Sequence, residues 1–596
     1  MLEKSSKPII SNKPMPLNTN NEKLTSKNVL NDRITKRFND RRLFIVLLRF
    51  IIPSILVSFF AALYIFVDQI MIVKFVTRSD LNPDSIFDND YFNFVDSNGQ
   101  SWIYQDYLTA SNNLKIPPFN INDLIRAAIS ISAPITVIIN ALTLLITMGL
   151  ANQFSKALGR GDEEKIKEVW ATGFITNVIV SIATSMIIVG VAKTWLTSSA
   201  NGTMNRSLES LDTNSRYGYI VSIFFSRFRE LQVQNASSYV YILAGLFTIQ
   251  TFNQMYFLLN QSEGRQLFIS IIPPLANLIN ILFDYLLIRY TSAGIAAAAY
   301  ATVIGWSLSC LAYVIYNIVL IKKKATHLEY REIFRKGHFN WNYLYLIILI
   351  GLASFFRNAA LSVSNGIFQT NLVTITEKIQ PNLPPNYYQS IFGSVTPISN
   401  LMLQSVWGLI HGSRSLCGFK FGQRNFKDIT KIYWYVPLIA FSYSSIVYLL
   451  FGFGLNNIFL INLFNIQGAD NLVVSNLVLR ITLVQSIFIA LSMNAQLLFQ
   501  STQRIGMAWI ASLMQGLFTF APVFFTMYNL AIDTNNIYLY IWIQPINAIL
   551  TCIGNWIISI PFAHKYREFV SKRFDIGTML DKYLNKTKNP KVKAKQ

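Results

Sequence analysis

Acidic residues are scarce in the long apolar runs of this sequence. The chain has 596 residues, of which 52% are hydrophobic and 14% charged, whereas a soluble domain carries about 25% charged residues. Within the apolar runs, the only carboxylates are Asp68 and Asp284. A charge at the centre of a bilayer costs at least about 2.5–3.5 kcal/mol, so acidic residues kept there usually mark an ion or substrate path. The scarcity favours a membrane transporter over a structural anchor.

Other absences narrow the function further. The three cysteines fall in or beside apolar runs, so no disulfide framework is visible. The four histidines are expected at cytoplasmic helix ends or in loops and not within the membrane, which argues against a histidine proton relay; they are His327, His338, His411 and His564. The sequence has neither a GxxxxGK[ST] phosphate-binding loop nor a His/Cys/carboxylate cluster. We therefore expect no enzyme and no cofactor, and we favour coupling to a gradient of Na⁺ or H⁺.

Long apolar stretches predict an all-α polytopic membrane protein. A span needs about 20 residues at 1.5 Å per residue. Twelve stretches meet this requirement: 43–76, 128–151, 169–195, 237–260, 267–290, 293–321, 343–372, 391–412, 432–453, 472–500, 506–528 and 537–562.

Basic residues predict how the spans are oriented. Segments 1–42 and 563–596 each hold ten Lys or Arg, and 322–338 holds six. Loop 77–123 holds two basic residues against seven Asp. By the positive-inside rule, both termini and the central linker are cytoplasmic and loop 77–123 is external. This arrangement requires an even number of spans, which agrees with twelve.

These boundaries divide the chain into five parts. We expect a disordered basic tail over 1–42, a six-helix lobe over 43–321, a cytoplasmic linker over 322–342, a second six-helix lobe over 343–562 and a second basic tail over 563–596. The first lobe would contain external loops 77–123 and 196–236. Their polar, low-complexity look predicts plain insertions.

A repeated glycine pattern relates the two lobes. The second span ends in Gly149, nine residues and Gly159, and the eighth ends in Gly408, nine residues and Gly418. The offset of 259 positions from Gly149 to Gly408 is close to half the chain. Because both halves would start on the same side, the pattern predicts a parallel pseudo-twofold repeat with a site between the lobes. Two unrelated glycine-rich helix ends are the alternative.

Two carboxylates on separate helices are predicted to lie at the same depth. Asp68 is about 28 Å along its helix from Arg49, and Asp284 is about 26 Å from Leu267. Asn280 shares a helix face with Asp284 at i, i+4 spacing, and Thr302 falls in the same half of the bilayer. Such oxygens suit a hard cation, and two neighbouring carboxylates can instead share protons. The alternative role for each aspartate is to fasten helices by hydrogen bonds.

Three further residues stand out within the spans. Pro53 removes an intrahelical bond, and its kink is either static or a bending point. Arg357, followed by Asn358, falls near the midplane of the seventh span. Arg357 is expected to snorkel or to pair with an aspartate; alternatively, these two residues line a substrate cavity and favour anionic or zwitterionic cargo.

From Arg49 to Pro561 the chain resembles the multidrug and toxic compound extrusion (MATE) transporters of the MOP flippase superfamily. The resemblance rests on the order and spacing of several segments: Pro53 with Asp68; Ala133-Pro134 through Gly149; Leu158-Gly159-Arg160-Gly161-Asp162; Asn280-x-x-x-Asp284 leading to Gly294 through Thr302; Gly351-Leu-Ala-Ser-Phe-Phe; and Gly408 through Gly422.

The resemblance implies a cation site in the amino-terminal lobe. In the family, an Asp in helix 1, an Asn and an Asp in helix 5 and a Thr in helix 6 bind the coupling ion, which carries over to Asp68, Asn280, Asp284 and Thr302. Some members have a second cation site with acidic residues in helices 7 and 10. The membrane region of the second half has no Asp or Glu, so we do not expect that site here.

The predicted function is cation-coupled antiport that exports amphipathic, usually cationic, compounds by alternating access. We expect a monomer in the plasma membrane, with both termini cytoplasmic, that contacts lipids and a small organic substrate and binds no nucleic acid. The main alternative is a flippase for a lipid or lipid-linked precursor, in which Arg357 would meet a phosphate. A non-transporting membrane scaffold is an alternative from another class.

Overall fold

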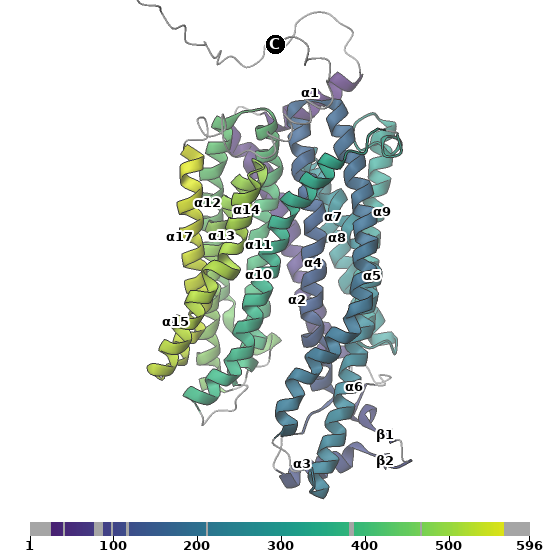
Figure 1. Cartoon of the computed structure of the whole chain (residues 1–596), viewed down its shortest axis with the longest axis vertical. Coiled ribbons are helices and arrows are strands. Elements are labelled where there is room, and N and C mark those ends of the chain that lie inside the picture. Colours follow the sequence, from purple (N-terminus) through teal and green to yellow (C-terminus); the bar gives the residue numbers. More distant parts are fainter. Residues whose placement is uncertain are drawn as a thin grey trace, which may run out of the picture.

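The computed structural model is almost entirely helical (Figure 1). It describes residues 26–39, 42–76, 87–96, 99–114, 118–209, 213–335, 337–380, 387–464, 466 and 468–564. The tail 565–596 and residues 1–25 lie outside this part of the chain. A single two-stranded sheet occurs in the described part, in which β1 pairs antiparallel with β2, Phe94 opposite Trp102.

The long helices form two lobes that lie side by side. The amino-terminal lobe contains α2 (Leu43–Phe75), α4 (Ile121–Arg160), α5 (Glu163–Glu209), α6 (Arg216–Gly245), α7 (Phe247–Ser262), α8 (Gln266–Tyr290) and α9 (Ile295–Lys322). Shorter elements precede or interrupt them: α1 (Ser26–Phe38), η1 (Asn89–Phe92), β1 (Phe94–Val95), β2 (Ser101–Trp102) and α3 (Tyr104–Leu114).

The connection between the lobes carries the single turn η2 (Tyr330–Glu332). The carboxy-terminal lobe then contains α10 (Trp341–Ile379), α11 (Tyr387–Gly422), α12 (Phe426–Leu449), η3 (Leu450–Gly454), η4 (Ile458–Leu463), α13 (Ala469–Ser501), α14 (Ile505–Leu513), η5 (Met514–Phe518), α15 (Phe520–Asp533), α16 (Ile537–Ile541) and α17 (Ile543–His564).

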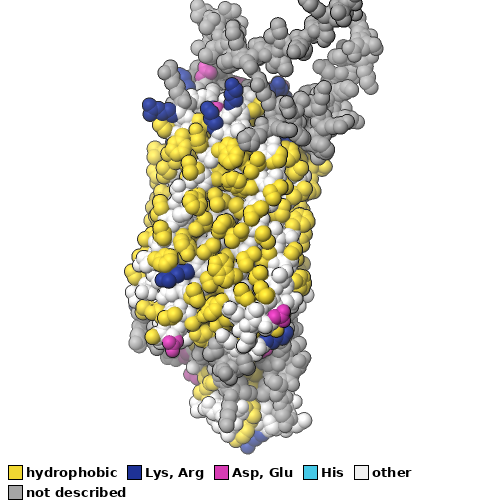
Figure 2. Space-filling view, turned by 90° about the vertical axis from the view of Figure 1, so that its left-hand side faces the viewer, with side chains coloured by type: hydrophobic (Ala, Val, Ile, Leu, Met, Phe, Trp, Pro, Cys, Tyr) yellow, Lys and Arg dark blue, Asp and Glu magenta, His cyan; other side chains and the backbone are white. Residues whose placement is uncertain are grey.

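Each of the twelve predicted spans falls on helical chain. Among the described residues, ten helices are long and apolar enough to cross a membrane, and the number is eleven if α6 and α7, which are bent by 48°, count as one broken span. The twelfth prediction, 391–412, corresponds to α11, which runs through the bundle but is too polar to pass the same test. On the face drawn in Figure 2, apolar side chains cover the middle and most of the Lys and Arg lie toward one end.

Polar residues at helix starts explain several boundaries. Asn120 and Asp123 form a reciprocal capping box at the start of α4, which satisfies two backbone N–H groups that would otherwise lack partners. Ser215, Asn340 and Asn425 cap α6, α10 and α12 in the same way with one side-chain acceptor each. These caps fix the residues at which the four helices begin.

The lobes touch most closely at the end that carries α1 and the 322–340 connection, here called the linker end. Glycines of one lobe lie against backbone of the other: Gly149 against Ile347, Gly351 against Leu145, and Gly408 against Ser54. Without side chains the helices approach until backbone meets backbone, as small residues permit in membrane bundles. Toward the opposite end, α4 and α10 diverge (Figure 1).

These contacts follow the predicted repeat. The second long helix of the first lobe, α4, crosses α10, the first of the second lobe; conversely, α11 crosses α2. Gly149 and Gly408 therefore have equivalent roles in the two crossings. The pattern that the sequence shows twice makes the contact between the lobes twice.

The prediction that 77–123 and 196–236 are plain loops is wrong where the structure describes them, because they contain helices and a two-stranded sheet. Instead of a loop over 196–236, α5 continues to Glu209 and α6 begins at Arg216. The two helices project beyond the bundle and, with η1, β1, β2 and α3, form an extension (Figure 1). An aromatic cluster fills it because apolar positions of α3 and α6 face each other; its members include Phe92, Tyr104, Tyr107, Phe119, Phe224 and Phe228.

The prediction of disorder over 1–42 is also wrong for residues 26–38, which form α1. Leu30, Ile34 and Phe38 recur every four residues and are buried, so the helix has one apolar face despite its polar composition. Phe38 stacks on Phe419 of α11 at 4.1 Å between ring centroids, and Arg37 donates to the carbonyl of Glu263 after α7, 3.0 Å away. The helix thus contacts both lobes at the linker end.

Candidate functional site

The structure brings Asp68 of α2 and Asp284 of α8 into each other's electrostatic range inside the amino-terminal lobe. Both side chains are buried, Asp284 completely. Among the described residues, neither oxygen of Asp284 and not Oδ1 of Asp68 has a hydrogen-bond partner. Buried polar atoms are normally satisfied, so unsatisfied carboxylate oxygens indicate a position built for something further.

Asn280 and Thr302 belong to the same region. Asn280 lies one turn before Asp284 on α8 and is buried, and neither its Oδ1 nor its Nδ2 has a partner in the described part of the chain. Gly305 of α9 lets the two helices close up, because a Cβ built there would lie 3.1 Å from the Cβ of Asn280. Thr302, also buried, lies one turn before Gly305.

The carboxylate pair also faces tyrosines that the sequence analysis did not select. Tyr64 of α2, which hydrogen-bonds with Trp306 of α9, and Tyr239 of α6 both lie within electrostatic range of Asp68 and Asp284. Carboxylate, amide and hydroxyl oxygens in one buried place can hold a hard cation, or the carboxylates can hold protons. The unsatisfied oxygens fit either ion.

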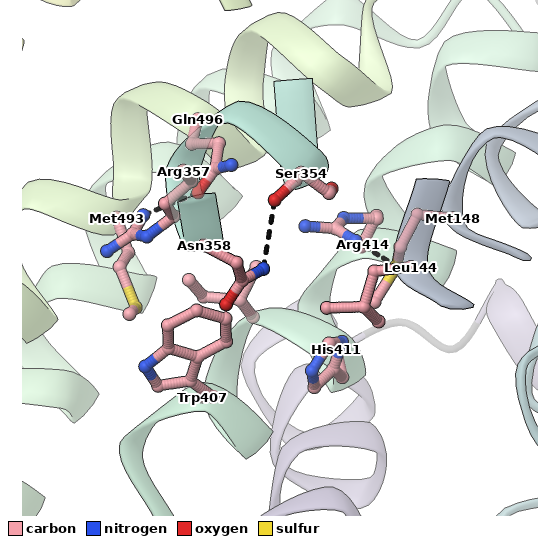
Figure 3. A pocket seen from close by; sticks show the side chains of 11 residues that line it. Leu144, Met148, Ser354, Arg357, Asn358, Trp407, His411, Arg414, Met493 and Gln496 are labelled. Atoms are coloured by element: carbon pink, nitrogen blue, oxygen red, sulfur yellow. Dashed lines mark hydrogen bonds between the residues drawn. The ribbon is translucent and has the colours of Figure 1, made fainter. Parts of the chain in front are cut away.

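A second site lies between the lobes, directly beyond the glycine contacts. A small cavity of about 20 Å³ is lined by Leu144 and Met148 of α4 and by residues of α10, α11 and α13, with no Asp or Glu among its described lining. The remaining lining residues are Ser354, Arg357, Asn358, Trp407, Ile410, His411, Arg414, Met493 and Gln496 (Figure 3). We call it the interlobe pocket.

Arg357 lies inside this pocket rather than at a membrane surface. Its side chain is buried, hydrogen-bonds with the Gln496 side-chain oxygen and lies over the Trp407 ring, with 5.2 Å from guanidinium carbon to ring centroid. Among the described residues, no acidic group pairs with it, and its Nε and Nη2 have no partner. The expectation of snorkelling or of an Asp partner is therefore wrong, because the neighbouring helices enclose the side chain.

A second arginine, Arg414, enters the pocket from α11. It too is buried, its Nη1 contacts the Met148 sulfur, and its Nε has no partner in the described part of the chain. Among the described residues, the charged side chain that affects Arg414 is Arg357, and the two positive charges repel each other. An unpaired buried charge is costly, and two of the same sign are more so.

His411 is in the pocket as well, which corrects its predicted place at the membrane surface. It lies eleven residues before the end of α11, about 16 Å along the helix axis. Its Nδ1 and the indole nitrogen of Trp407 have no partners among the described residues. A second small cavity on the linker side shares Met148, His411 and Arg414.

Pro53 lies within α2, which continues through it. The neighbouring hydroxyl of Ser54 donates to the Phe50 carbonyl at 2.8 Å and accepts from the Gln261 side chain at 2.7 Å. Whether this position bends during function stays a prediction.

Comparison with known proteins agrees with this architecture. Residues 126–224 match the MatE family model. The chain is 35% identical over 537 residues to the "Uncharacterized protein MG447 homolog" of Mycoplasma pneumoniae, covering 90% of this chain and 94% of that protein. It superposes on the outward-facing conformation of a multidrug resistance MATE family transporter of the MOP superfamily with a TM-score of 0.66 and 16% identity, over 90% of this chain and 98% of that one.

The chain belongs to the MATE family. A MOP superfamily transporter from Pyrococcus furiosus, described by a binding pocket of reverse polarity that suggests a different function, has the same fold, with a TM-score of 0.66, 16% identity and coverage of 90% and 98%. Twelve helices in two lobes are the architecture of these neighbours, and this MATE chain is a multi-pass membrane protein.

The residues that the sequence analysis missed had a signal in the sequence. Trp407, His411 and Arg414 are spaced i, i+4 and i+7, which places them on one face of α11. Tyr64 is likewise four residues before Asp68. The MATE resemblance assigned no role to any of these positions, although His411 and Arg414 lie in its Gly408–Gly422 segment, and the predicted span 391–412 ended before Arg414.

Proposed function

We propose that this MATE protein is a secondary transporter in which a cation at Asp68, Asn280, Asp284 and Thr302 drives alternating access of the interlobe pocket. The observation that carries the proposal is the pair of buried carboxylates whose oxygens lack partners within the described residues. A cation that binds one conformer more tightly than the other shifts the equilibrium between them, and this differential affinity is the source of coupling.

The charge asymmetry of the sequence supports one orientation of the protein in the membrane. The basic residues of 1–42, 322–338 and 563–596 support a linker end and termini that face the cytoplasm, with the protein in the plasma membrane. With the linker end closed, the described conformer then faces outward and is ready to take up Na⁺ or H⁺. Exchange for an outgoing amphipathic compound is the cycle we propose, performed by a monomer without a cofactor.

The cargo need not be cationic. The interlobe pocket has two buried arginines and no carboxylate, which favours the alternative of a lipid or lipid-linked precursor flippase over export of cationic drugs. The flippase version uses the same cation site and the same two-lobe motion, so both versions can be tested together.

The test is transport in proteoliposomes that contain the full chain. Fluorescent amphiphiles, one cationic and one anionic, are loaded in parallel, and Na⁺ and H⁺ gradients are imposed in turn. Wild type is compared with Asp68→Asn and Asp284→Asn; Asp533→Asn, at an exposed acidic residue at the end of α15, is the matched control.

We expect gradient-driven transport in wild type and Asp533→Asn and its loss in the other two variants. The ion whose gradient is effective is the coupling ion. Transport that persists in folded Asp68→Asn and Asp284→Asn would show that coupling lies elsewhere.

A further inference from the structure

The interlobe pocket holds two positive charges that nothing in the described part of the chain neutralises. Arg357 and Arg414 are 4% and 6% exposed, and three of their nitrogens lack hydrogen-bond partners within the described residues. Trp407 and His411 add two more unpartnered nitrogens to the same cavity. Arginines usually stay buried only when paired, so the pocket is incomplete without a negatively charged ligand.

The donor geometry indicates what kind of anion fits. The free edge of Arg357 carries Nε and Nη2, the pair of donors that a guanidinium offers to two oxygens of one group, while Nη1 is used by Gln496. Arg414 supplies Nε from a different helix. These donors line one cavity from α10 and α11. A group with three or more oxygens offers acceptors to both, and phosphate meets this requirement better than carboxylate.

The rest of the lining indicates what the phosphate is attached to. Leu144, Met148, Ile410 and Met493 form apolar walls. Methionines adapt to irregular apolar groups. In this conformer the enclosed space is about 20 Å³, room for about one water molecule, so a headgroup enters only when the lobes move apart.

We propose that the interlobe pocket binds the phosphate of an anionic amphiphile through Arg357 and Arg414, which defines the cargo class of the transporter. That the bound compound is transported rests on the proposed function; that it binds does not. The phosphate belongs either to a lipid headgroup or to a soluble organic phosphate, and the test separates these sources.

The test measures binding to the purified full chain in a neutral detergent. The probes are inorganic phosphate, glycerol 3-phosphate, short-chain phosphatidylglycerol and a cationic amphiphile, at constant ionic strength. Affinity is read calorimetrically and, independently, from the rise in unfolding temperature that a ligand of the native state causes. Arg357→Gln and Arg414→Gln are compared with Arg480→Gln, whose arginine lies in α13 and contacts the Gly452 carbonyl and the Phe453 ring instead of the pocket.

We expect phosphate probes to bind wild type and Arg480→Gln, and to lose about tenfold or more in affinity in each pocket variant. Preference for phosphatidylglycerol assigns a lipid, and equal or tighter binding of glycerol 3-phosphate assigns a soluble phosphate. Without ligand, Arg357→Gln should unfold at a temperature equal to or higher than wild type, because it removes an unpaired buried charge. This readout remains informative if a variant binds too weakly to measure.

Binding of the cationic amphiphile in preference to all phosphate probes, or unchanged phosphate affinity in both pocket variants, overturns the proposal. Asp68→Asn separates it from the coupling hypothesis. If Asp68→Asn transports normally while phosphate binding depends on the arginines, coupling fails and the cargo class stands. If Asp68→Asn abolishes transport while phosphate affinity is unchanged in both arginine variants, the proposed cargo class is rejected and the coupling hypothesis stands.

Discussion

A Cβ atom on Gly351 of α10 would overlap the backbone carbonyl of Leu145 on α4. The two helices belong to different lobes, and Gly149 meets Ile347 in the same crossing. The linker end is therefore closed by backbone surfaces that tolerate no added atoms.

Gly351→Ala should open the linker end. Overpacking costs about 1–3 kcal/mol, which shifts a two-state equilibrium by a factor of about 5 to 150. Spin labels at Lys322 and Lys427, both exposed and on different lobes, should report a larger separation. Gly366→Ala, on the same helix with open space around it, is the control and should leave the distance unchanged. Equal distances in both variants would show that the crossing does not hold the lobes.

Tyr64→Phe should weaken the response to the coupling ion. It removes a hydroxyl beside Asp68 and Asp284 and leaves the ring in place. One lost hydrogen bond or ligand is worth about 1 kcal/mol, so the ion concentration for half-maximal transport should rise about fivefold with little change in maximal rate. Tyr217→Phe, at an exposed tyrosine of the extension, serves as control. An unchanged ion dependence would remove Tyr64 from the cation site.

Phe38→Ala should release α1 from the linker end. The ring is fully buried and packs on Phe419 and Phe50, and Phe→Ala changes of this kind cost about 3–5 kcal/mol. Amide hydrogen exchange over 26–38 should become fast, while α4 and α10 keep their protection. Lys36→Ala, on the exposed face of α1, should change nothing. Retained protection in Phe38→Ala would mean that polar contacts alone hold the helix.

Glu332 should make stability depend on pH in the acid range. Burial raises the pKa of this carboxyl, but the charges of Lys167, His338 and Arg335 more than offset it and hold the pKa below its usual 4.5. The stabilisation is therefore complete above about pH 4.5 and is lost as pH falls through the lower pKa of the folded protein. The unfolding temperature of wild type should exceed that of Glu332→Gln near neutral pH, and the difference should shrink below pH 4.5. A constant difference across this range would contradict the ion-pair account.

The membrane helices could be predicted because burial in lipid demands long apolar segments, which the sequence displays openly. The neighbourhood of Asp68 and Asp284 followed from counting residues along two helices. The direction in which the Arg357 side chain points could not be predicted, because it depends on which helices enclose α10. Nor could α1 or the extension be foreseen from hydropathy: Leu30, Ile34 and Phe38 are isolated among polar residues, and the aromatic residues of the extension find their partners only across α3 and α6.

The extension formed by η1, β1, β2, α3 and the projecting parts of α5 and α6 belongs to one lobe alone. Helical membrane proteins with little mass outside the bilayer are difficult to orient in single-particle images, because their projections resemble one another. Here the extension gives the particle an asymmetric landmark. An antibody fragment raised against its exposed residues, such as Val95 and Tyr219, would mark the amino-terminal lobe in every image without touching the pocket, so that the rotation of one lobe against the other can be followed directly.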